Sequence, residues 1–165
     1  KKDDVIACGR VITGDQVIVN KMAYNFVAPK RGDVSVFDTR NIKHDQVRKN
    51  TFYIKRMVGM PNEQIKIKDG MLLADAKVVD QPDIFKKIMS KIKTEYHGGY
   101  GNDGILTTSE DKIYLDDDMY LMLGDNTAPG MSLDGRFFGG VPRRDFRGPA
   151  VFVYWPFRDH WGQIQ

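Results

Sequence analysis

The chain has 165 residues, of which 41% are hydrophobic and 28% charged, and this composition is typical of a folded globular domain rather than a disordered chain. Its formal net charge of +3 is small and its basic residues are spread out, so we expect no nucleic-acid partner. No run approaches the roughly 18 apolar residues that a membrane-spanning helix needs, and the single cysteine, Cys8, excludes a disulfide within the chain.

Short strands are predicted along the first half of the chain. Turn signals at 14–15 and 29–33 precede apolar strand-like runs over 16–20 and 34–37. A polar loop over 40–50 leads to a β-rich run over 52–58. The residues 63–68 then alternate, and Asp69-Gly70 is a strong hairpin signal that predicts a returning strand over 71–75.

One helix is predicted, from about Pro82 to Tyr96. Pro82 can open a helix, and lysines separate apolar residues that recur at helical spacing, namely Ile84, Phe85, Ile88, Met89 and Ile92. This basic amphipathic segment would either touch a membrane or a partner, or pack as a surface helix on a sheet. Its shortness favours packing.

Strands resume over 120–123 and 150–155, so nearly everything outside 82–96 is predicted to be β. We interpret residues 1–165 as a single domain. Its β-core would comprise about 11–75 and 113–157, with an inserted α/β subdomain over about 76–112.

Lys55 is the first candidate for chemistry, because it stands in an apolar run beside Ile54, Met57 and Val58. Burial among such side chains disfavours the ammonium form and lowers the pKa, and a neutral amine can act as a general base. The alternative is an ordinary strand lysine, since alternation could send Lys55 toward solvent together with Tyr53.

A second cluster follows far downstream. It begins at Gly124-Asp125-Asn126 and continues with Ser132, Asp134 and Arg136. Such residues are common in loops. However, a serine two residues from an aspartate, itself two from an arginine, could orient an amine. Together with Lys55, the cluster points to Ser/Lys hydrolase chemistry.

In order along almost the whole chain, these motifs resemble the type I signal peptidases, membrane-bound Ser/Lys endopeptidases that remove signal peptides from exported proteins. The run Tyr53–Pro61 is similar to the lysine box of that family, and Gly124–Val141 to its last box. The segments 14–21, 29–37 and 155–157 also resemble the family. The resemblance implies a β-core of coiled antiparallel sheets.

Residue by residue, the resemblance implies that Lys55 is the general base and that Ser132 orients its amine. Asp134 and Arg136 would form an ion pair that holds the loop, with Asp125 and Arg56 as further supports. The mechanism requires no metal and no cofactor. The implied partners are the signal peptides of exported preproteins and the membrane surface. The implied location is the outer face of a cell membrane, with an anchoring segment before Lys1.

The resemblance fails where the family carries its nucleophile. A Ser-Met-x-Pro segment is expected shortly before Gly14, but residues 5–10 contain no Ser, Met or Pro, and the first serine of the chain is Ser35. Because the chain opens on Lys1 rather than Met, we interpret it as a piece of a longer protein and expect the serine upstream. This chain alone is then expected to be inactive. Cys8 as a substitute nucleophile lacks the surrounding motif.

Two smaller departures are expected to be tolerated. Residues 127–131 make the last box two residues longer than is common, which Pro129-Gly130 can absorb as a wider turn. Asn62-Glu63 replaces a Gly-Asp pair, and Asn also tolerates a positive φ.

Other readings stay open. A catalytically inactive relative would bind preproteins or assist surface-protein assembly, although such a protein has no need of a buried amine. A self-cleaving switch of the LexA type would need a DNA-binding domain and a cleavage segment, and the sequence contains neither. Trp155, Phe157 and Trp161 would touch lipid, or Trp155 would cap the core. The scattered histidines His44, His97 and His160 predict no metal site.

Overall fold

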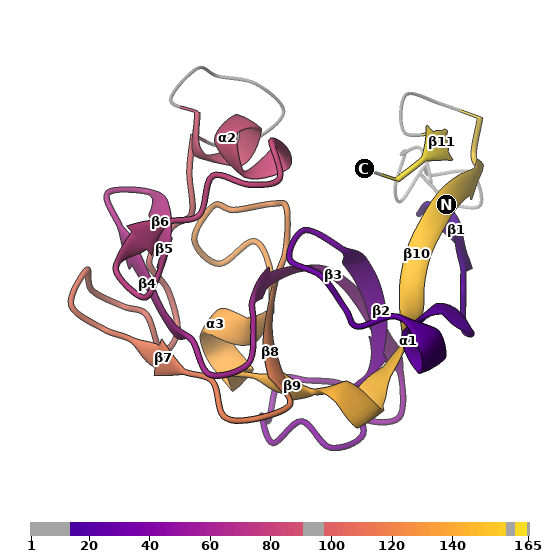
Figure 1. Cartoon of the computed structure of the whole chain (residues 1–165), viewed down its shortest axis with the longest axis horizontal. Helices are drawn as coiled ribbons and strands as arrows, with labels where there is room; N and C mark the ends of the chain where they lie inside the picture. Colours follow the sequence, from indigo (N-terminus) through magenta and orange to yellow (C-terminus); the bar gives the residue numbers. More distant parts are fainter. Residues whose placement is uncertain (1–13, 91–97, 158–160, 165) are drawn as a thin grey trace, which may run out of the picture.

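The computed structural model of the chain describes residues 14–90, 98–157 and 161–164 (Figure 1). Its strands are β1 (Gln16–Val19), β2 (Val34–Asp38), β3 (Phe52–Gly59), β4 (Gln64–Lys68), β5 (Met71–Ala74), β6 (Lys77–Val78), β7 (Ile113–Tyr114), β8 (Met119–Leu123), β9 (Val141–Pro142), β10 (Phe146–Trp155) and β11 (Gly162–Gln163). Its helices are α1 (Ala23–Phe26), α2 (Ile84–Met89), α3 (Gly135–Phe138) and the 3-10 turn η1 (Arg143–Asp145). The protein is mostly β, as predicted.

The larger sheet has seven antiparallel strands in the order β1-β10-β2-β3-β8-β9, with β11 paired to β10. Figure 1 shows this sheet curling round so that β10, β2, β3, β8 and β9 surround one core. Antiparallel sheets twist, and the twist lets one face close over apolar side chains. The buried side chains at this core are Phe37, Ile42, Val47, Met57, Tyr120, Met122, Val141 and Phe146.

A second sheet has four strands in the order β6-β5-β4-β7. The predicted hairpin at Asp69-Gly70 is confirmed, because it joins β4 to β5 in register from Ile65–Ala74 to Lys68–Met71. A separate hydrophobic core lies against this sheet. The sheet begins at Gln64 and ends at Tyr114, so its strands stand on both sides of the proposed boundaries near 76 and 112. The division of the chain at those positions stays a prediction.

Helix α2 is shorter than predicted. It begins at Ile84, and it ends before Ser90, whose backbone is extended (φ −63°, ψ 130°); residues 91–96 lie outside the described part of the chain. Phe85 and Ile88 are fully buried in the second core. The packing interpretation is therefore confirmed for residues 84–89.

Within the described residues, the prediction that nearly everything outside 82–96 is β is wrong at α1, at α3 and at the 3-10 turn η1. Helices α1 and α3 each contain four residues, which is too short for a helical hydrophobic period to be visible in the sequence. Contacts with the large sheet stabilise both turns. Tyr24 of α1 packs edge-on against Phe146 of β10, and Gly135 and Arg136 of α3 are buried.

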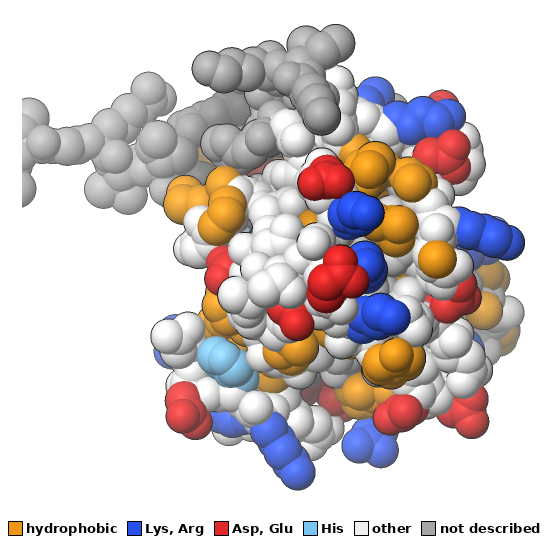
Figure 2. Space-filling view, turned by 90° about the vertical axis from the view of Figure 1, so that its left-hand side faces the viewer, with side chains coloured by type: hydrophobic (Ala, Val, Ile, Leu, Met, Phe, Trp, Pro, Cys, Tyr) orange, Lys and Arg blue, Asp and Glu red, His pale blue; other side chains and the backbone are white. Residues whose placement is uncertain are grey.

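The surface is mixed. On the side that carries the four-stranded sheet, acidic and basic side chains stand next to one another (Figure 2).

Near the C-terminal end, Phe157 contacts both Trp155 and Trp161, with ring centroids 5.5 and 5.7 Å apart, and all three rings are substantially exposed. Trp155 is thus a partner of this exposed cluster rather than a cap on the core. None of the helices in the described ranges is long and apolar enough to cross a membrane.

Candidate active site

Lys55 lies in the middle of β3, on the strand face that turns toward the core of the large sheet. In the β2–β3 register Lys55 is opposite Ser35, and Tyr53 is opposite the buried Phe37. Residues two apart on a strand share a face, so Lys55 and Tyr53 point the same way. The Lys55 Nζ lies 6.0 Å from the Tyr53 ring centroid, and the lysine is half-buried. The solvent-facing alternative is therefore wrong.

The loop between β8 and α3 brings Ser132 to this lysine. Lys55 Nζ donates a hydrogen bond of 2.8 Å to Ser132 Oγ, although the two residues are 77 positions apart. Ser132 is only 6% exposed. The contact depends on Gly124, because a Cβ at that position would lie 2.2 Å from Ser132 Oγ and 3.4 Å from Lys55 Nζ. A side chain at 124 would displace the serine from the amine.

Burial sets the electrostatics of Lys55. Desolvation is the largest influence and lowers the pKa of the amine below its ordinary value. The carboxylate of Asp134 acts in the opposite direction, the guanidinium of Arg136 lowers the pKa further, and Asp125 raises it slightly. The net effect is a larger neutral fraction of Lys55 than a surface lysine has at the same pH. Such an amine can accept a proton.

Asp134 and Arg136 form a fully buried ion pair beneath the serine loop. Arg136 Nη2 and Nε donate to the two carboxylate oxygens at 2.9 and 3.0 Å. Asp134 also accepts the Gly124 N–H at 2.9 Å and caps α3 by accepting the Arg136 backbone N–H at 3.1 Å. The pair thus links the end of β8 to the start of α3, and Ser132 lies between them.

Arg56 and Asp125 form a second, separate ion pair. Two hydrogen bonds of 2.9 and 2.8 Å join the guanidinium to the carboxylate, and Arg56 Nη1 donates to the Gly32 carbonyl at 2.8 Å. Because Arg56 is the neighbour of Lys55 on β3, it points to the opposite face. This pairing fixes Asp125, which stands between Gly124 and Asn126, against β3 at the edge of the site.

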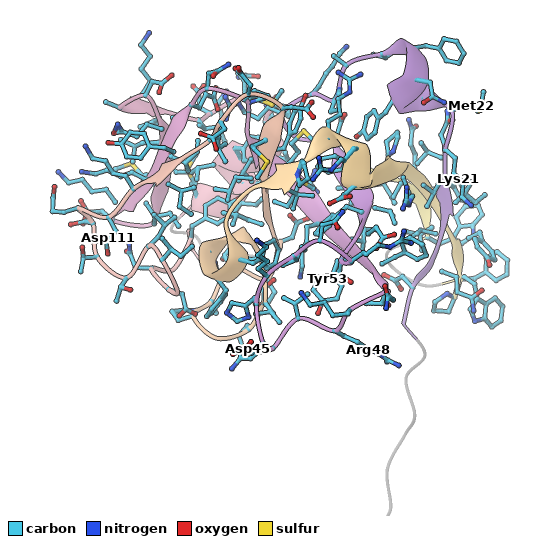
Figure 3. All side chains as sticks on the ribbon, turned by 90° about the horizontal axis from the view of Figure 1, so that it is seen from below. Lys21, Met22, Asp45, Arg48, Tyr53 and Asp111 are labelled. Atoms are coloured by element: carbon cyan, nitrogen blue, oxygen red, sulfur yellow. The ribbon has the colours of Figure 1, made fainter. Side chains whose placement is uncertain are left out.

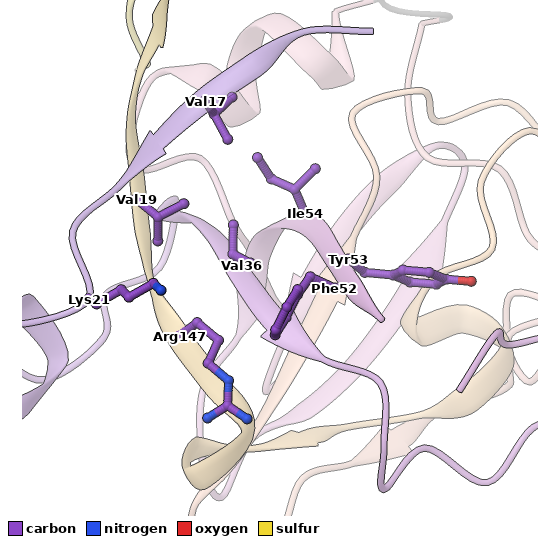
Figure 4. A pocket seen from close by; sticks show the side chains of 8 residues that line it. All are labelled: Val17, Val19, Lys21, Val36, Phe52, Tyr53, Ile54 and Arg147. Atoms are coloured by element: carbon purple, nitrogen blue, oxygen red, sulfur yellow. The ribbon is translucent and has the colours of Figure 1, made fainter. Parts of the chain in front are cut away.

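A cavity of about 270 Å³ opens at Lys55. Its lining combines apolar side chains with the polar groups described above, namely Val34, Ile54, Lys55, Arg56, Gly124, Asp125, Asn126, Met131 and Ser132. An apolar groove of about 350 Å³ adjoins it, since Ile54 lines both. The apolar groove is formed by Val17, Val19, Lys21, Val36, Phe52, Tyr53, Ile54 and Arg147 (Figure 4).

A family model described as signal peptidase, peptidase S26, matches residues 10–155. The chain belongs to this family. The resemblance inferred from the lysine box and the last box is therefore confirmed at the level of the family.

Relatives of this signal peptidase family member include two bacterial proteins. This chain is 32% identical to signal peptidase I of Leptolyngbya laminosa over 143 residues, which are 86% of this chain and 61% of that protein. It is also 32% identical to signal peptidase I of Bacillus caldolyticus over 146 residues, 88% of this chain and 72% of that one. The chain thus spans about three fifths of the first relative's length.

The fold is also similar to a crystal structure of a signal peptidase I from Enterococcus faecalis. The TM-score is 0.53 at 21% identity, and the match covers 76% of this chain and 98% of that one. This likeness supports the antiparallel β architecture of the family.

Some residues of the site were not anticipated from the sequence. Arg136 Nη1 donates to the carbonyls of Gly101 and Thr127 at 3.1 and 3.2 Å, and backbone acceptors leave no side-chain signal. Ser35, opposite Lys55 in the register, is fully buried, and its hydroxyl is hydrogen-bonded to Tyr24. Pairing the two predicted strands could have placed Ser35 opposite Lys55, but only if the register between the strands had been known.

Two further expectations concern the ends of motifs. Asn62 has a φ of 65°, so the expected tolerance of a positive φ in the Asn62-Glu63 turn is confirmed. Cys8 and residues 5–10, where the nucleophile was sought, lie outside the described residues. Within the described ranges, no three His, Cys, Asp or Glu side chains are grouped so as to hold a metal ion.

Proposed function

We propose that this chain is the peptidase-like domain of a signal-peptide endopeptidase that cleaves exported preproteins, with Lys55 as general base. The observation that carries the proposal is the hydrogen bond of Lys55 to Ser132 beside an open cavity, in a chain of the signal peptidase family. Ser132 orients the amine. The Asp134–Arg136 and Arg56–Asp125 pairs hold the segments on which these two residues stand.

The chemistry needs a neutral Lys55 and a serine hydroxyl. The amine takes the hydroxyl proton while the oxygen attacks the scissile carbonyl, and the resulting ammonium then returns a proton to the leaving amine. Ser35 does not fit this role because it is fully buried and bonded to Tyr24. Because no Ser-Met-x-Pro segment precedes Gly14, we propose that the nucleophile is a serine outside the 165 residues, and we expect these residues alone to be inactive.

The substrate would lie extended along β3. Pairing with β8 starts at Arg56, so within the described strands the Phe52–Lys55 half of β3 pairs on one edge only, with β2. A peptide can add to such an edge by backbone hydrogen bonds. Next to it, Val17, Val19, Val36 and Ile54 point toward one another across the apolar groove (Figure 4). We expect the groove to receive small apolar side chains that precede the cut.

We expect the domain to act at the membrane surface, on the outer face of a cell membrane. Large apolar side chains are exposed near β1 and β10, including Phe26 (80%) and Phe157 (70%). Together with Trp155 and Trp161 they offer aromatic rings of the kind that lie at a membrane interface. An anchoring segment before Lys1 is part of the same proposal.

The test uses the full-length protein and an exported preprotein, with cleavage followed by the appearance of the shortened product. Lys55→Ala should abolish cleavage, because it removes the base. Lys68→Ala replaces an exposed strand lysine on β4 and should leave cleavage unchanged.

A catalytically inactive relative predicts a different result. It would bind the preprotein without producing any shortened product, and neither Lys55→Ala nor Lys68→Ala would change that result. Binding without cleavage by the wild type would contradict the enzymatic proposal.

A further inference from the structure

The loop that carries Ser132 lies on a neighbouring turn formed by residues 101–106. The Gly101 N–H donates to the Thr127 carbonyl at 3.0 Å, at the start of the loop. Packing is equally close, since a Cβ on Gly101 would come within 2.7 Å of the Pro129 ring. The two segments are therefore in contact over several residues.

This turn is itself fixed to the second core. Leu106 is fully buried, and its N–H donates to the Asp103 carbonyl at 2.9 Å. Asn102 Nδ2 donates to the carbonyls of Ile67 and Leu106 at 3.2 and 3.0 Å. In the same turn, the Ile105 N–H donates to the Arg136 carbonyl at 2.6 Å. The turn is thus fixed by several contacts that do not involve the Asp103 side chain.

From that turn, the carboxylate of Asp103 reaches the loop. Its Oδ2 accepts the Gly130 N–H at 2.6 Å, and its Oδ1 accepts the Gly104 N–H at 2.9 Å. Ser132 is two residues from Gly130 and two from Asp134, whose carboxylate accepts the Gly124 N–H. The serine therefore stands midway between two anchored points of the chain. Asp134 fixes one side and Asp103 the other.

We propose that Asp103 is a positioning residue: its carboxylate holds the 127–131 loop so that the Ser132 hydroxyl stays on Lys55. Without this bond the loop would lose the hydrogen bond of Gly130, and its contacts at Thr127, Pro129 and Asp134 would remain. Opening of the loop would admit water to Lys55 and turn Ser132 away from the amine. The catalytic consequence rests on the proposed function, but the structural one does not.

The test compares Asp103→Ala with a matched control, Asp111→Ala. Asp111 Oδ2 also accepts a backbone N–H at 2.6 Å, from Thr108, but this bond stays within its own turn. Figure 3 shows Asp111 at one end of the molecule, away from Tyr53, which is two residues from Lys55 on β3. Both substitutions remove one negative charge and one hydrogen bond of 2.6 Å from a backbone N–H, and Asp103→Ala also removes the bond from the Gly104 N–H within its own turn.

Two measurements report on the loop without requiring catalysis. The first is hydrogen exchange of the Gly130 amide, which should become about 10-fold faster in Asp103→Ala because a local opening is eased. The second is the titration of the Lys55 side chain followed by NMR, whose midpoint should rise as desolvation is relieved. Loss of a negative charge alone would lower that midpoint, so a rise reports opening of the loop. The charged groups that act on Lys55, namely Asp134, Arg136 and Asp125, are the same in all variants.

In the full-length protein, kcat on a preprotein should fall about 10-fold in Asp103→Ala with little change in KM. The substitution misplaces the reacting groups but leaves substrate binding intact. Asp111→Ala should match the wild type in all three measurements. Equal Gly130 exchange and an equal Lys55 titration in the two variants would overturn the inference. If the wild type cleaves no preprotein while these two readouts still differ, the proposed function fails and the positioning of the loop stands.

Discussion

The proposed role of Lys55 as general base sets two requirements: the amine must lose its proton easily, and it must point at its target. Burial meets the first by lowering the pKa of the amine. The hydrogen bond to Ser132 meets the second by fixing the direction of Nζ. A lysine side chain has several rotatable bonds, so the second requirement is not satisfied by the strand alone.

Replacing Ser132 separates these two contributions. In Ser132→Ala the amine keeps its surroundings but loses its orienting partner, so kcat of the full-length protein should fall roughly 10- to 100-fold with a small change in KM. Steady-state cleavage of a preprotein measures both constants. Ser109→Ala, in the 108–111 turn, is the control and should leave them unchanged. An unaltered kcat in Ser132→Ala would show that the hydroxyl does not orient Lys55.

The lowered pKa of Lys55 also predicts a pH dependence of stability. Between the pKa in the folded protein and the ordinary value of about 10.4, the unfolded chain binds more protons, so the free energy of unfolding rises with pH. Lys55→Met removes this contribution. The free energy of unfolding of the wild type minus that of the variant should therefore become more positive as pH rises toward 10, by at most about 1.4 kcal/mol per pH unit. Urea unfolding at several pH values measures the difference, and parallel curves would contradict a lowered pKa.

At the scale of elements, the site is a junction between β3, the end of β8 and the start of α3. Helix α3 has only four residues and is held by the Asp134 cap and the buried Arg136. The same two side chains hold the loop on which Ser132 lies. One buried ion pair thus fixes both the short helix and the serine.

Breaking this ion pair should cost more than neutralising it. Arg136→Met leaves the Asp134 carboxylate buried without its partner and should destabilise the protein by about 3–5 kcal/mol. Adding Asp134→Asn removes the buried charge while an amide oxygen can still accept the Gly124 N–H. The double variant should therefore be more stable than Arg136→Met alone, as measured by chemical unfolding. A double variant whose loss equals the sum of the two single losses would contradict the coupling.

At the scale of the whole molecule, two sheets with separate cores bring distant segments to one place. Periodicity and turn signals predicted most of the longer strands, because alternation and Asp69-Gly70 act over a few residues. They did not predict α1 and α3, whose single turns depend on contacts with the large sheet. They predicted the β4–β5 hairpin of the second sheet but not its pairing with β7, because β7 joins β4 across a separation of about 50 residues.

The candidate site was only partly readable from the sequence for a similar reason. Lys55, Ser132 and the two ion pairs are side chains in recognisable motifs, so a resemblance could bring them together. The carbonyls of Gly101 and Thr127 and the carboxylate of Asp103 act through the tertiary contact of two loops. No local pattern marks such a contact, and only the folded chain brings the partners within hydrogen-bond distance.

The most direct test of Lys55 as a general base is the pH profile of kcat/KM for preprotein cleavage by the full-length protein. If neutral Lys55 is required, the rate should rise with pH through one ionisation whose midpoint lies below the ordinary lysine value of about 10.4. That ionisation should belong to Lys55 in an NMR titration of the same protein. A rate that does not follow the Lys55 titration, or cleavage that persists in Lys55→Ala, would contradict the assignment.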